Sequence, residues 1–323
     1  MKTALRMSPK RILIAVDDFT TSHLERIQQT VGNRAELVVL PQNAPETKYR
    51  AALRNAEVAV GWPKADWLID TPVKFLQIGS SGWDDYQNKG LEEHGIALCN
   101  GRGKYSVGVA EHAIGMMMAL VRRIPAHVRD KDERKFRRHL PYPSEIAGST
   151  ALIVGLGDIG TELAKRCKGL EMKTVAIVRR PREPSESVHE MVLLADLKTA
   201  VQQADHIFLT MPGSVENINL FSRDVLTCAK PTAYLYNLSR GTTIDEPALF
   251  ELLRDNKLAG AGLDVTTVEP LPEDSPLWKL GDNVLITGHS AGLSTGHTDR
   301  FCQLVCRNLN LYLTEQSLEN RVL

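Results

Sequence analysis

The sequence predicts an α/β protein of two parallel-sheet domains, in which the second domain is inserted into the first. Its 323 residues exceed what one ordinary hydrophobic core holds and suit two domains. Short apolar segments with strand character alternate with helical segments along nearly the whole chain. The last helical segment follows no strand of its own, so we expect it to return to the first domain.

Two series of buried strands are expected, separated by crossover helices. Continuous apolar strands between helices indicate parallel sheets that are covered on both faces. The first series is predicted at 12–16, 36–40, 58–61, 75–78 and 96–98. The second is predicted at 151–155, 174–178, 206–210, 233–238, 262–265 and 284–287.

Helical periodicity at 109–122 and again at 301–313 marks the two joints between these series. We therefore expect residues 1–100 and 292–323 to form one domain and residues 101–291 to form the inserted domain.

The composition argues against nucleic-acid and membrane partners. Lysine plus arginine number 39, as do aspartate plus glutamate, so the formal net charge is zero and no global field attracts a polyanion. No apolar run approaches the 18 or so residues of a spanning helix. The basic lead-in at 1–10 precedes an apolar stretch of only 12–16, so we expect no export signal and a cytoplasmic protein.

The five cysteines indicate neither a disulfide framework nor a metal centre, because they are odd in number and form no CxxC motif. Cys302 and Cys306 share a helix face. A metal pair there is one interpretation, but packing inside an apolar stripe is favoured.

A glycine motif follows the first strand of the second series and opens a helix, which is the context that a dinucleotide site requires. Gly155 allows the tight turn, Gly157 lets the backbone approach a pyrophosphate, and Gly160 lets the helix pack against the strand. Asp158 and Ile159 begin that helix, whose free N–H groups favour phosphate. The alternative is a glycine-rich turn without a ligand.

The end of the next strand predicts which nicotinamide cofactor is preferred. An NAD site places a carboxylate there, but Val178 occupies the position and Arg179, Arg180 and Arg182 follow. Guanidinium groups bind a 2′-phosphate that a carboxylate would repel. We expect NADP(H) to be preferred, with NAD(H) possible; the alternative is a solvated basic loop.

Three further strand ends carry polar signatures that can meet at one edge of a sheet. They are Asn237-Leu238-Ser239-Arg240-Gly241, then Gly262-Leu263-Asp264-Val265 with Glu269 beyond it, and then Gly288-His289-Ser290-Ala291-Gly292. Ligands of doubly wound sheets bind at the carboxyl ends of the strands.

With these motifs the sequence resembles the D-isomer-specific 2-hydroxyacid dehydrogenase family over nearly its whole length. The segment 75–84 resembles the family's substrate loop, and 109–113 resembles its interdomain helix. Two departures stand out. Gly288 occupies a usual proline position, which is expected to loosen the histidine loop, and Lys135-Phe136 replaces the usual Gly-x-Trp.

The resemblance implies a Rossmann dinucleotide-binding domain inserted into a flavodoxin-like substrate domain. It implies that Arg240 binds and polarises a 2-oxoacid and that His289, paired with Glu269, is the acid and base. It also implies that Ser81, Gly82 and Trp83 bind the substrate carboxylate, although Trp83 is equally explained as a packing residue. Further cofactor contacts are implied at Met211, Pro212, Leu238, Ser239, Asp264, Ala291 and Gly292.

The function that follows from the resemblance is interconversion of a small 2-oxoacid, of the glyoxylate or hydroxypyruvate type, and a D-2-hydroxyacid. A homodimer is implied, with the helix beginning near Val109 in its interface and His112 as a packing residue of that helix. Two alternatives stay open: a phosphoglycerate dehydrogenase-like enzyme, and a nucleotide-sensing, corepressor-like binding protein on the same fold.

Overall fold

The computed structural model describes residues 10–138, 142–181, 183 and 185–323; Arg182 and the lead-in at 1–9 lie outside them. The chain forms two compact units. One contains the described residues up to Lys104 together with Thr295–Leu323, and the other spans Tyr105–Ser294. The boundaries expected from the sequence lie near these crossings, at 100 and 292.

The first unit is a parallel sheet whose five described strands follow the order β2-β1-β3-β4-β5. Alternate residues of its strands serve two separate cores, since successive strand side chains point to opposite faces. Ile12 and Ile14 belong to one core, and Leu13 and Ala15 to the other. The strands are β1 (Lys10–Ala15), β2 (Ala35–Val39), β3 (Val58–Gly61), β4 (Phe75–Gln77) and β5 (Ala97–Cys99).

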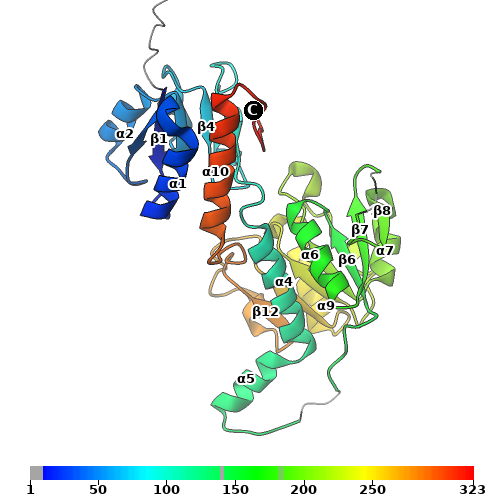
Figure 1. The fold of residues 1–323 in the computed structure, drawn as a ribbon. Helices are drawn as coiled ribbons and strands as arrows, with labels where there is room; N and C mark the ends of the chain where they lie inside the picture. Colours follow the sequence, from blue (N-terminus) through cyan, green and yellow to red (C-terminus); the bar gives the residue numbers. More distant parts are fainter. Residues whose placement is uncertain (1–9, 139–141, 182, 184) are drawn as a thin grey trace, which may run out of the picture. The chain divides into compact units, whose positions relative to one another are not determined.

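Helices cover both faces of this sheet, as the apolar strands require. On one face, the last helix, α10 (His297–Leu313), runs beside α1 (Thr21–Val31) and contributes Phe301, Cys302, Val305 and Leu309 to the core (Figure 1). The other face carries α2 (Glu46–Leu53) and α3 (Ala65–Leu68); the short 3₁₀ turns are η1 (Gly32–Arg34) and η2 (Asp84–Tyr86). The predicted return of the last helix to the first domain is therefore confirmed.

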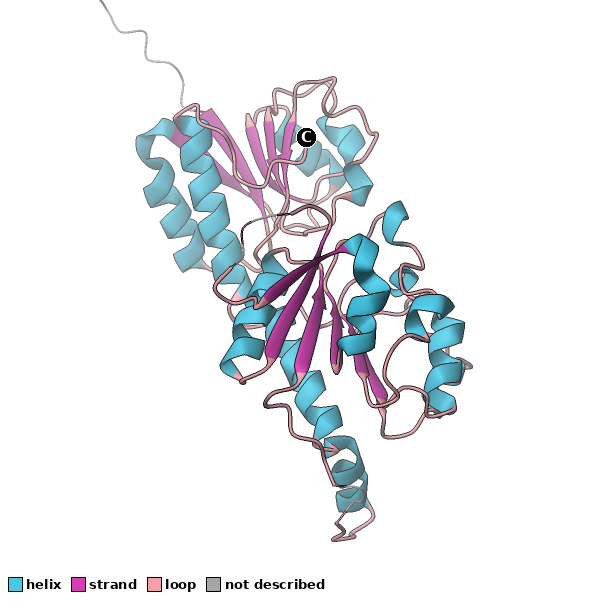
Figure 2. Ribbon diagram, turned by 90° about the vertical axis from the view of Figure 1, so that its right-hand side faces the viewer, coloured by secondary structure: helices cyan, strands magenta, loops and turns pink. Residues whose placement is uncertain are grey.

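The second unit is also a parallel sheet, and its described strands follow the order β12-β11-β10-β9-β6-β7-β8. Figure 2 shows strands in magenta with helices in cyan beside them. The order reverses beside β6, between β7 and β9, which creates the switch point where doubly wound sheets bind ligands. The strands are β6 (Thr150–Val154), β7 (Lys173–Val178), β8 (Glu190–Leu193), β9 (His206–Leu209), β10 (Tyr234–Asn237), β11 (Gly260–Leu263) and β12 (Val284–Ile286).

Two apolar cores lie on the two faces of this second sheet. One packs α4 (Ser106–Val121) and α6 (Asp158–Gly169) over Ile153, Phe208 and Tyr236. The other packs α7 (Leu197–Gln203), α8 (Arg223–Leu226) and α9 (Glu246–Arg254) over Leu152, Ile207 and Leu235. The remaining elements are α5 (Ile124–Asp132) and the 3₁₀ turns η3 (Leu194–Asp196), η4 (Val215–Asn217), η5 (Gly241–Thr243) and η6 (Pro276–Lys279).

The strand predicted least well is β8, which the sequence analysis did not anticipate. It is an edge strand of four residues, and none of them is fully buried. Such a strand lacks the continuous apolar run that marked the others. No helix in the described part of the chain is long and apolar enough to span a membrane.

A buried histidine in this fold makes stability depend on pH. His206 begins β9, is 4% exposed, and stacks with the rings of Tyr234 and Tyr236. Burial lowers the pKa of His206 to about 4, from about 6.5 in the unfolded chain, against a smaller opposing effect of Asp205. Between these values the unfolded chain binds the additional proton, so the folded state loses stability as pH falls.

We expect the free energy of unfolding to fall by up to about 3 kcal/mol between pH 7.5 and pH 4 because of this residue. His206→Gln should flatten that part of the profile, measured by urea unfolding at several pH values. His94→Gln is the control, because it removes a histidine that is exposed. An unchanged slope in His206→Gln would show that the buried imidazole is not responsible.

Candidate functional site

The turn between β6 and α6 has a geometry that requires its glycines. Gly155 has φ of +99°, and a Cβ there would lie 2.8 Å from the backbone of Met211. At Gly160 a Cβ would lie 2.1 Å from the carbonyl oxygen of Gly155. Thr210 donates its hydroxyl to that same oxygen at 2.7 Å. The turn thus packs closely against the end of β9. A side chain at Gly155 would collide with the backbone of Met211, and one at Gly160 would collide with the carbonyl oxygen of Gly155.

The middle glycine faces open space. A Cβ built on Gly157 would meet nothing within 4 Å, so the backbone is accessible where α6 begins at Asp158 and Ile159. The N-terminus of a helix offers N–H groups and a positive dipole end to phosphate. The residues present therefore fit the pyrophosphate of a dinucleotide.

A cavity of about 490 Å³ opens beside this turn at the switch point. Six of its lining residues were predicted from the sequence as cofactor contacts: Gly155, Gly157, Arg179, Arg180, Met211 and Pro212. The sequence analysis missed Leu194, Asn217 and Leu220, which come from segments without a recognisable motif. Apolar walls with a few polar groups are typical of nucleotide pockets.

The two described arginines at the end of β7 differ in their surroundings. Arg179 donates from Nη1 to Glu216 Oε2 at 2.6 Å and from Nη2 to Asn217 Oδ1 at 2.9 Å. Arg180 is exposed, and no hydrogen bond or ion pair joins its guanidinium to another described residue. The sequence analysis expected both to contact a 2′-phosphate; the structure shows Arg179 already engaged and Arg180 accessible.

The carboxylate of Asp264 holds the loop that carries His289. Asp264 follows β11, is 3% exposed, and accepts from the N–H groups of Ser290 at 3.0 Å and Ala291 at 3.1 Å. Its main-chain oxygen accepts from the N–H of His289 at 2.8 Å, and its carboxylate accepts from the Thr287 hydroxyl at 2.5 Å. Three consecutive N–H groups thus bind one residue, and the loosening expected from Gly288 stays a prediction.

His289 and Glu269 form the predicted pair. Nδ1 of His289 lies 2.8 Å from Oε2 of Glu269, and the other carboxylate oxygen accepts from the Thr266 N–H at 3.2 Å. The His289 side chain is 51% exposed, so its ring is available to a ligand. Its backbone has φ of +50°, a region that non-glycine residues rarely adopt and that functional sites often contain.

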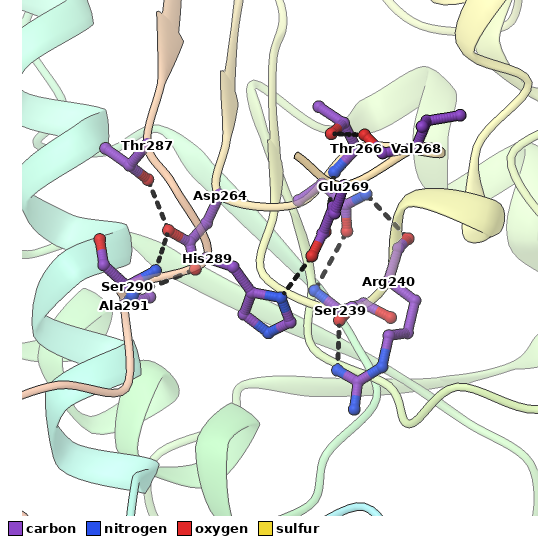
Figure 3. A network of polar contacts seen from close by, with 11 residues as sticks. Ser239, Arg240, Asp264, Thr266, Val268, Glu269, Thr287, His289, Ser290 and Ala291 are labelled. Atoms are coloured by element: carbon purple, nitrogen blue, oxygen red, sulfur yellow. Dashed lines mark hydrogen bonds and ion pairs between the residues drawn. The ribbon is translucent and has the colours of Figure 1, made fainter. Parts of the chain in front are cut away.

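Arg240 belongs to the same network (Figure 3). Its carbonyl oxygen accepts from the Asn237 side chain at 3.0 Å, and its Nη1 donates to the Ser239 carbonyl at 2.8 Å. The guanidinium of Arg240 and the ring of His289 extend to the same side of the network in Figure 3. An acid, its carboxylate partner and a forked cation therefore lie together at the carboxyl ends of β10, β11 and β12.

Eight predicted cofactor residues are absent from the cavity lining: Asp158, Ile159 and Gly160 at the start of α6, and five residues farther along the chain. Leu238 and Ser239 are buried, and the Ser239 hydroxyl donates to the Met211 carbonyl at 2.7 Å. Ala291 is buried, Gly292 lies against the Tyr105 ring, and Asp264 serves the histidine loop. These residues support the loops around the site; their predicted cofactor contacts stay predictions.

The loop predicted to bind the substrate carboxylate lies in the first unit. The carbonyl oxygens of Ser81 and Gly82 accept from Asn100 Nδ2 at 2.7 Å and from Ser80 Oγ at 2.8 Å. The N–H groups of Ser81, Gly82 and Trp83 have no recorded partner among the described residues. Trp83 is partly buried against an apolar cluster, so it also packs.

Two further sequence interpretations can be compared with the structure. His112 was interpreted as a packing residue, but its Nε2 also lies 3.0 Å from the Thr287 hydroxyl, which binds Asp264. Cys302 is buried in the core under α10, and Cys306 packs beside it. Within the described residues, no group of three or more His, Cys, Asp or Glu side chains could hold a metal ion.

Comparison with known proteins identifies relatives of this arrangement. Residues 114–291 match the family model described as D-isomer specific 2-hydroxyacid dehydrogenase, NAD binding domain. The chain is 34% identical to D-3-phosphoglycerate dehydrogenase of Archaeoglobus fulgidus over 86% of its own length, but it spans only 51% of that relative. It is also 34% identical to hydroxypyruvate reductase of Thermotoga maritima, over 84% of this chain and 89% of the relative.

A solved structure shares the fold over almost the whole chain. The D-isomer specific 2-hydroxyacid dehydrogenase family protein of Aeromonas salmonicida subsp. salmonicida A449 superposes with a TM-score of 0.82 at 28% identity, covering 98% of this chain and 99% of that one.

The Asp264 network yields a prediction. Asp264→Asn replaces one acceptor oxygen with an N–H₂ group that faces a donor, so at least one buried hydrogen bond is lost. We expect the free energy of unfolding to fall by about 1–3 kcal/mol and turnover to fall with it. Asp274, which is exposed in the same half of the unit, is the matched control as Asp274→Asn. Equal unfolding midpoints for the two variants would contradict the anchoring role.

Proposed function

Because the chain belongs to the D-isomer specific 2-hydroxyacid dehydrogenase family, we propose that it interconverts a small 2-oxoacid and a D-2-hydroxyacid, with a preference for NADP(H). The observation that carries this proposal is the His289–Glu269 pair, 2.8 Å apart, in one network with Arg240. This set lies on the same sheet as the glycine turn and its cavity.

Each of the three side chains has a role that its chemistry supports. The planar fork of Arg240 suits two oxygens at once, so it binds the carboxylate and the keto oxygen of a 2-oxoacid and polarises the carbonyl. A nicotinamide cofactor bound at the glycine turn would supply the hydride that adds to the carbonyl carbon. Nε2 of protonated His289 gives its proton to the carbonyl oxygen, and takes it back in the reverse direction.

Glu269 acts on His289 through its hydrogen bond. Because Nδ1–H of His289 donates to Oε2 of Glu269, Nε2 is the nitrogen left to exchange a proton with the substrate. The Thr266 N–H donates to the other oxygen of this carboxylate and holds the carboxylate in place.

We propose glyoxylate or hydroxypyruvate as the first substrates to test, because a preference for NADPH favours reduction and the chain is similar to a hydroxypyruvate reductase. Phosphoglycerate oxidation is the second candidate, favoured by the similarity to the Archaeoglobus enzyme. A nucleotide-sensing binding protein on this fold would not need Arg240, Glu269 and His289 together, so their combination argues against that role.

The cofactor preference rests on the end of β7. Val178 cannot accept a hydrogen bond from the ribose 2′-hydroxyl of NAD, and Arg180 is exposed beside the cavity. One exposed charge-assisted contact and one missing acceptor suggest a roughly ten- to thirty-fold preference for NADPH over NADH in kcat/KM. The preference should weaken at high salt, because screening acts on exposed charges.

A substrate panel with both cofactors tests the proposal. We expect absorbance loss at 340 nm with glyoxylate or hydroxypyruvate, faster with NADPH, and no turnover of ketones that lack a carboxylate. Arg180→Ala should reduce the efficiency with NADPH and spare NADH. Equal use of NADH by the unaltered chain would refute the cofactor preference, and no reduction of any 2-oxoacid would refute the activity.

The His289–Glu269 pair makes a separate prediction. His289→Ala should lower kcat for reduction by about 10²- to 10⁴-fold with little change in NADPH binding, because the proton donor is lost. Glu269→Gln should lower kcat with little change in NADPH binding, because the His289 ring loses the carboxylate that fixes its orientation. Glu273→Gln, in the same loop and exposed, is the control. A kcat of Glu269→Gln equal to that of the control would show the pairing to be unimportant.

For the assembly we propose a homodimer. Ile124 and Val128 lie one turn apart on α5 and are 48% and 50% exposed, so they form an apolar strip that a second copy could cover. Small-angle scattering at micromolar concentration should give twice the mass of the 35.8 kDa chain. A monomeric mass would rule the dimer out.

A further inference from the structure

The ion pair between Arg179 and Glu216 joins two loops that border the same cavity. Arg179 follows β7, whereas Glu216 lies in η4, on the loop after β9, and 37 residues separate them in sequence. Nη1 of Arg179 lies 2.6 Å from Oε2 of Glu216. Arg179 and Asn217, the neighbour of Glu216, both line the cavity. The pair therefore lies beside the pocket and is not remote from it.

The loop that carries Glu216 is fixed by the hydrogen bonds of its neighbour Asn217. Asn217 is 4% exposed, its Nδ2 donates to the Pro212 carbonyl at 2.7 Å, and its Oδ1 accepts from Nη2 of Arg179 at 2.9 Å. The guanidinium of Arg179 is thus bound on two of its nitrogens by one loop. Glu216 is the charged acceptor for this guanidinium, and Asn217 is the neutral acceptor.

The position of this pair gives it a consequence for ligand choice. The residue at the end of the second strand of such a sheet faces the ribose 2′ position, and here that residue is Val178, directly before Arg179. A 2′-phosphate carries between one and two negative charges and binds best to an unpaired guanidinium. The carboxylate of Glu216 already neutralises Arg179 and repels a second anion beside it.

We propose that Glu216 is a specificity-determining residue that competes with the ribose 2′-phosphate of NADP(H) for Arg179. With Glu216 charged, Arg180 carries most of the phosphate recognition and the discrimination between the two cofactors is moderate. Without that charge, Arg179 becomes a second phosphate ligand and the discrimination increases. This inference deepens the proposed function and rests on the dinucleotide site assigned there.

Binding of two nucleotide fragments to the full chain tests the proposal without any turnover. Adenosine 2′,5′-bisphosphate contains the phosphate in question, and 5′-AMP lacks it, so the ratio of their dissociation constants isolates the 2′-phosphate. Isothermal titration gives both constants. Glu216→Gln keeps the shape and polarity of the side chain and removes only its charge.

We expect Glu216→Gln to tighten binding of the 2′,5′-bisphosphate roughly three- to ten-fold and to leave 5′-AMP within two-fold, because one exposed charge contact is being released. In a chain that also carries Arg179→Ala, the same change should have less than a two-fold effect. Glu251→Gln is the control, since Glu251 pairs with Arg223 at 2.7 Å in another exposed ion pair, and neither residue lines the cavity.

The possible results separate this inference from the proposed function. A fragment ratio that Glu216→Gln leaves unchanged, or that it shifts toward 5′-AMP, overturns the competition, because Glu216 would then be neutral or would orient Arg179 for binding. If the unaltered chain shows no preference for the 2′-phosphate and Arg180→Ala changes nothing, the NADP(H) preference fails instead. A gain in Glu216→Gln that persists fully without Arg179 also overturns the proposal.

Discussion

The buried carboxylate of Asp264 is the interaction on which the geometry of the site depends. Asp264 follows β11, and its carboxylate accepts hydrogen bonds from the N–H groups of Ser290 and Ala291. Its main-chain carbonyl oxygen accepts a hydrogen bond from the N–H group of His289. A left-handed backbone at His289 carries strain, and that strain persists only where surrounding contacts specify it. The contact with Glu269 then follows, because the loop presents Nδ1 of the ring to the carboxylate at 2.8 Å.

Parallel strand order explains why the nucleotide turn and this network share one edge of the sheet. Every strand pair among the described residues of the second unit is parallel, so the carboxyl ends of β6, β10, β11 and β12 all face the same way. The glycines of the β6 turn fit closely against β9, where Thr210 and Met211 follow the strand. Ser239 extends this connection to β10 through the Met211 carbonyl. The side chains of the network thus depend on packing between strand ends as much as on their own loops.

The sequence predicted the parts of this structure that local patterns encode. Apolar runs identified the buried strands within one or two residues at most ends, and the glycine spacing identified the turn at Gly155. The short, half-exposed strand β8 carried no comparable pattern and was missed. The roles of Asp264 and Asn217 depend on contacts between segments that are far apart in sequence. The ion pair of Arg179 and Glu216, which are 37 residues apart, is of the same kind. For the same reason Arg179 looked available when its charge was already shared.

The route of the chain through the first unit has a consequence for synthesis. Its core needs Phe301, Val305 and Leu309 of α10, yet the strands they cover end at Cys99. During translation, the second unit, which is continuous from Tyr105 to Ser294, can complete its core before α10 leaves the ribosome. Until then, this face of the first sheet has the cover of α1 but lacks the cover that α10 supplies. The first unit therefore finishes folding after the second, although most of its chain precedes the second unit, and its incomplete core is the part of the nascent chain most exposed to aggregation.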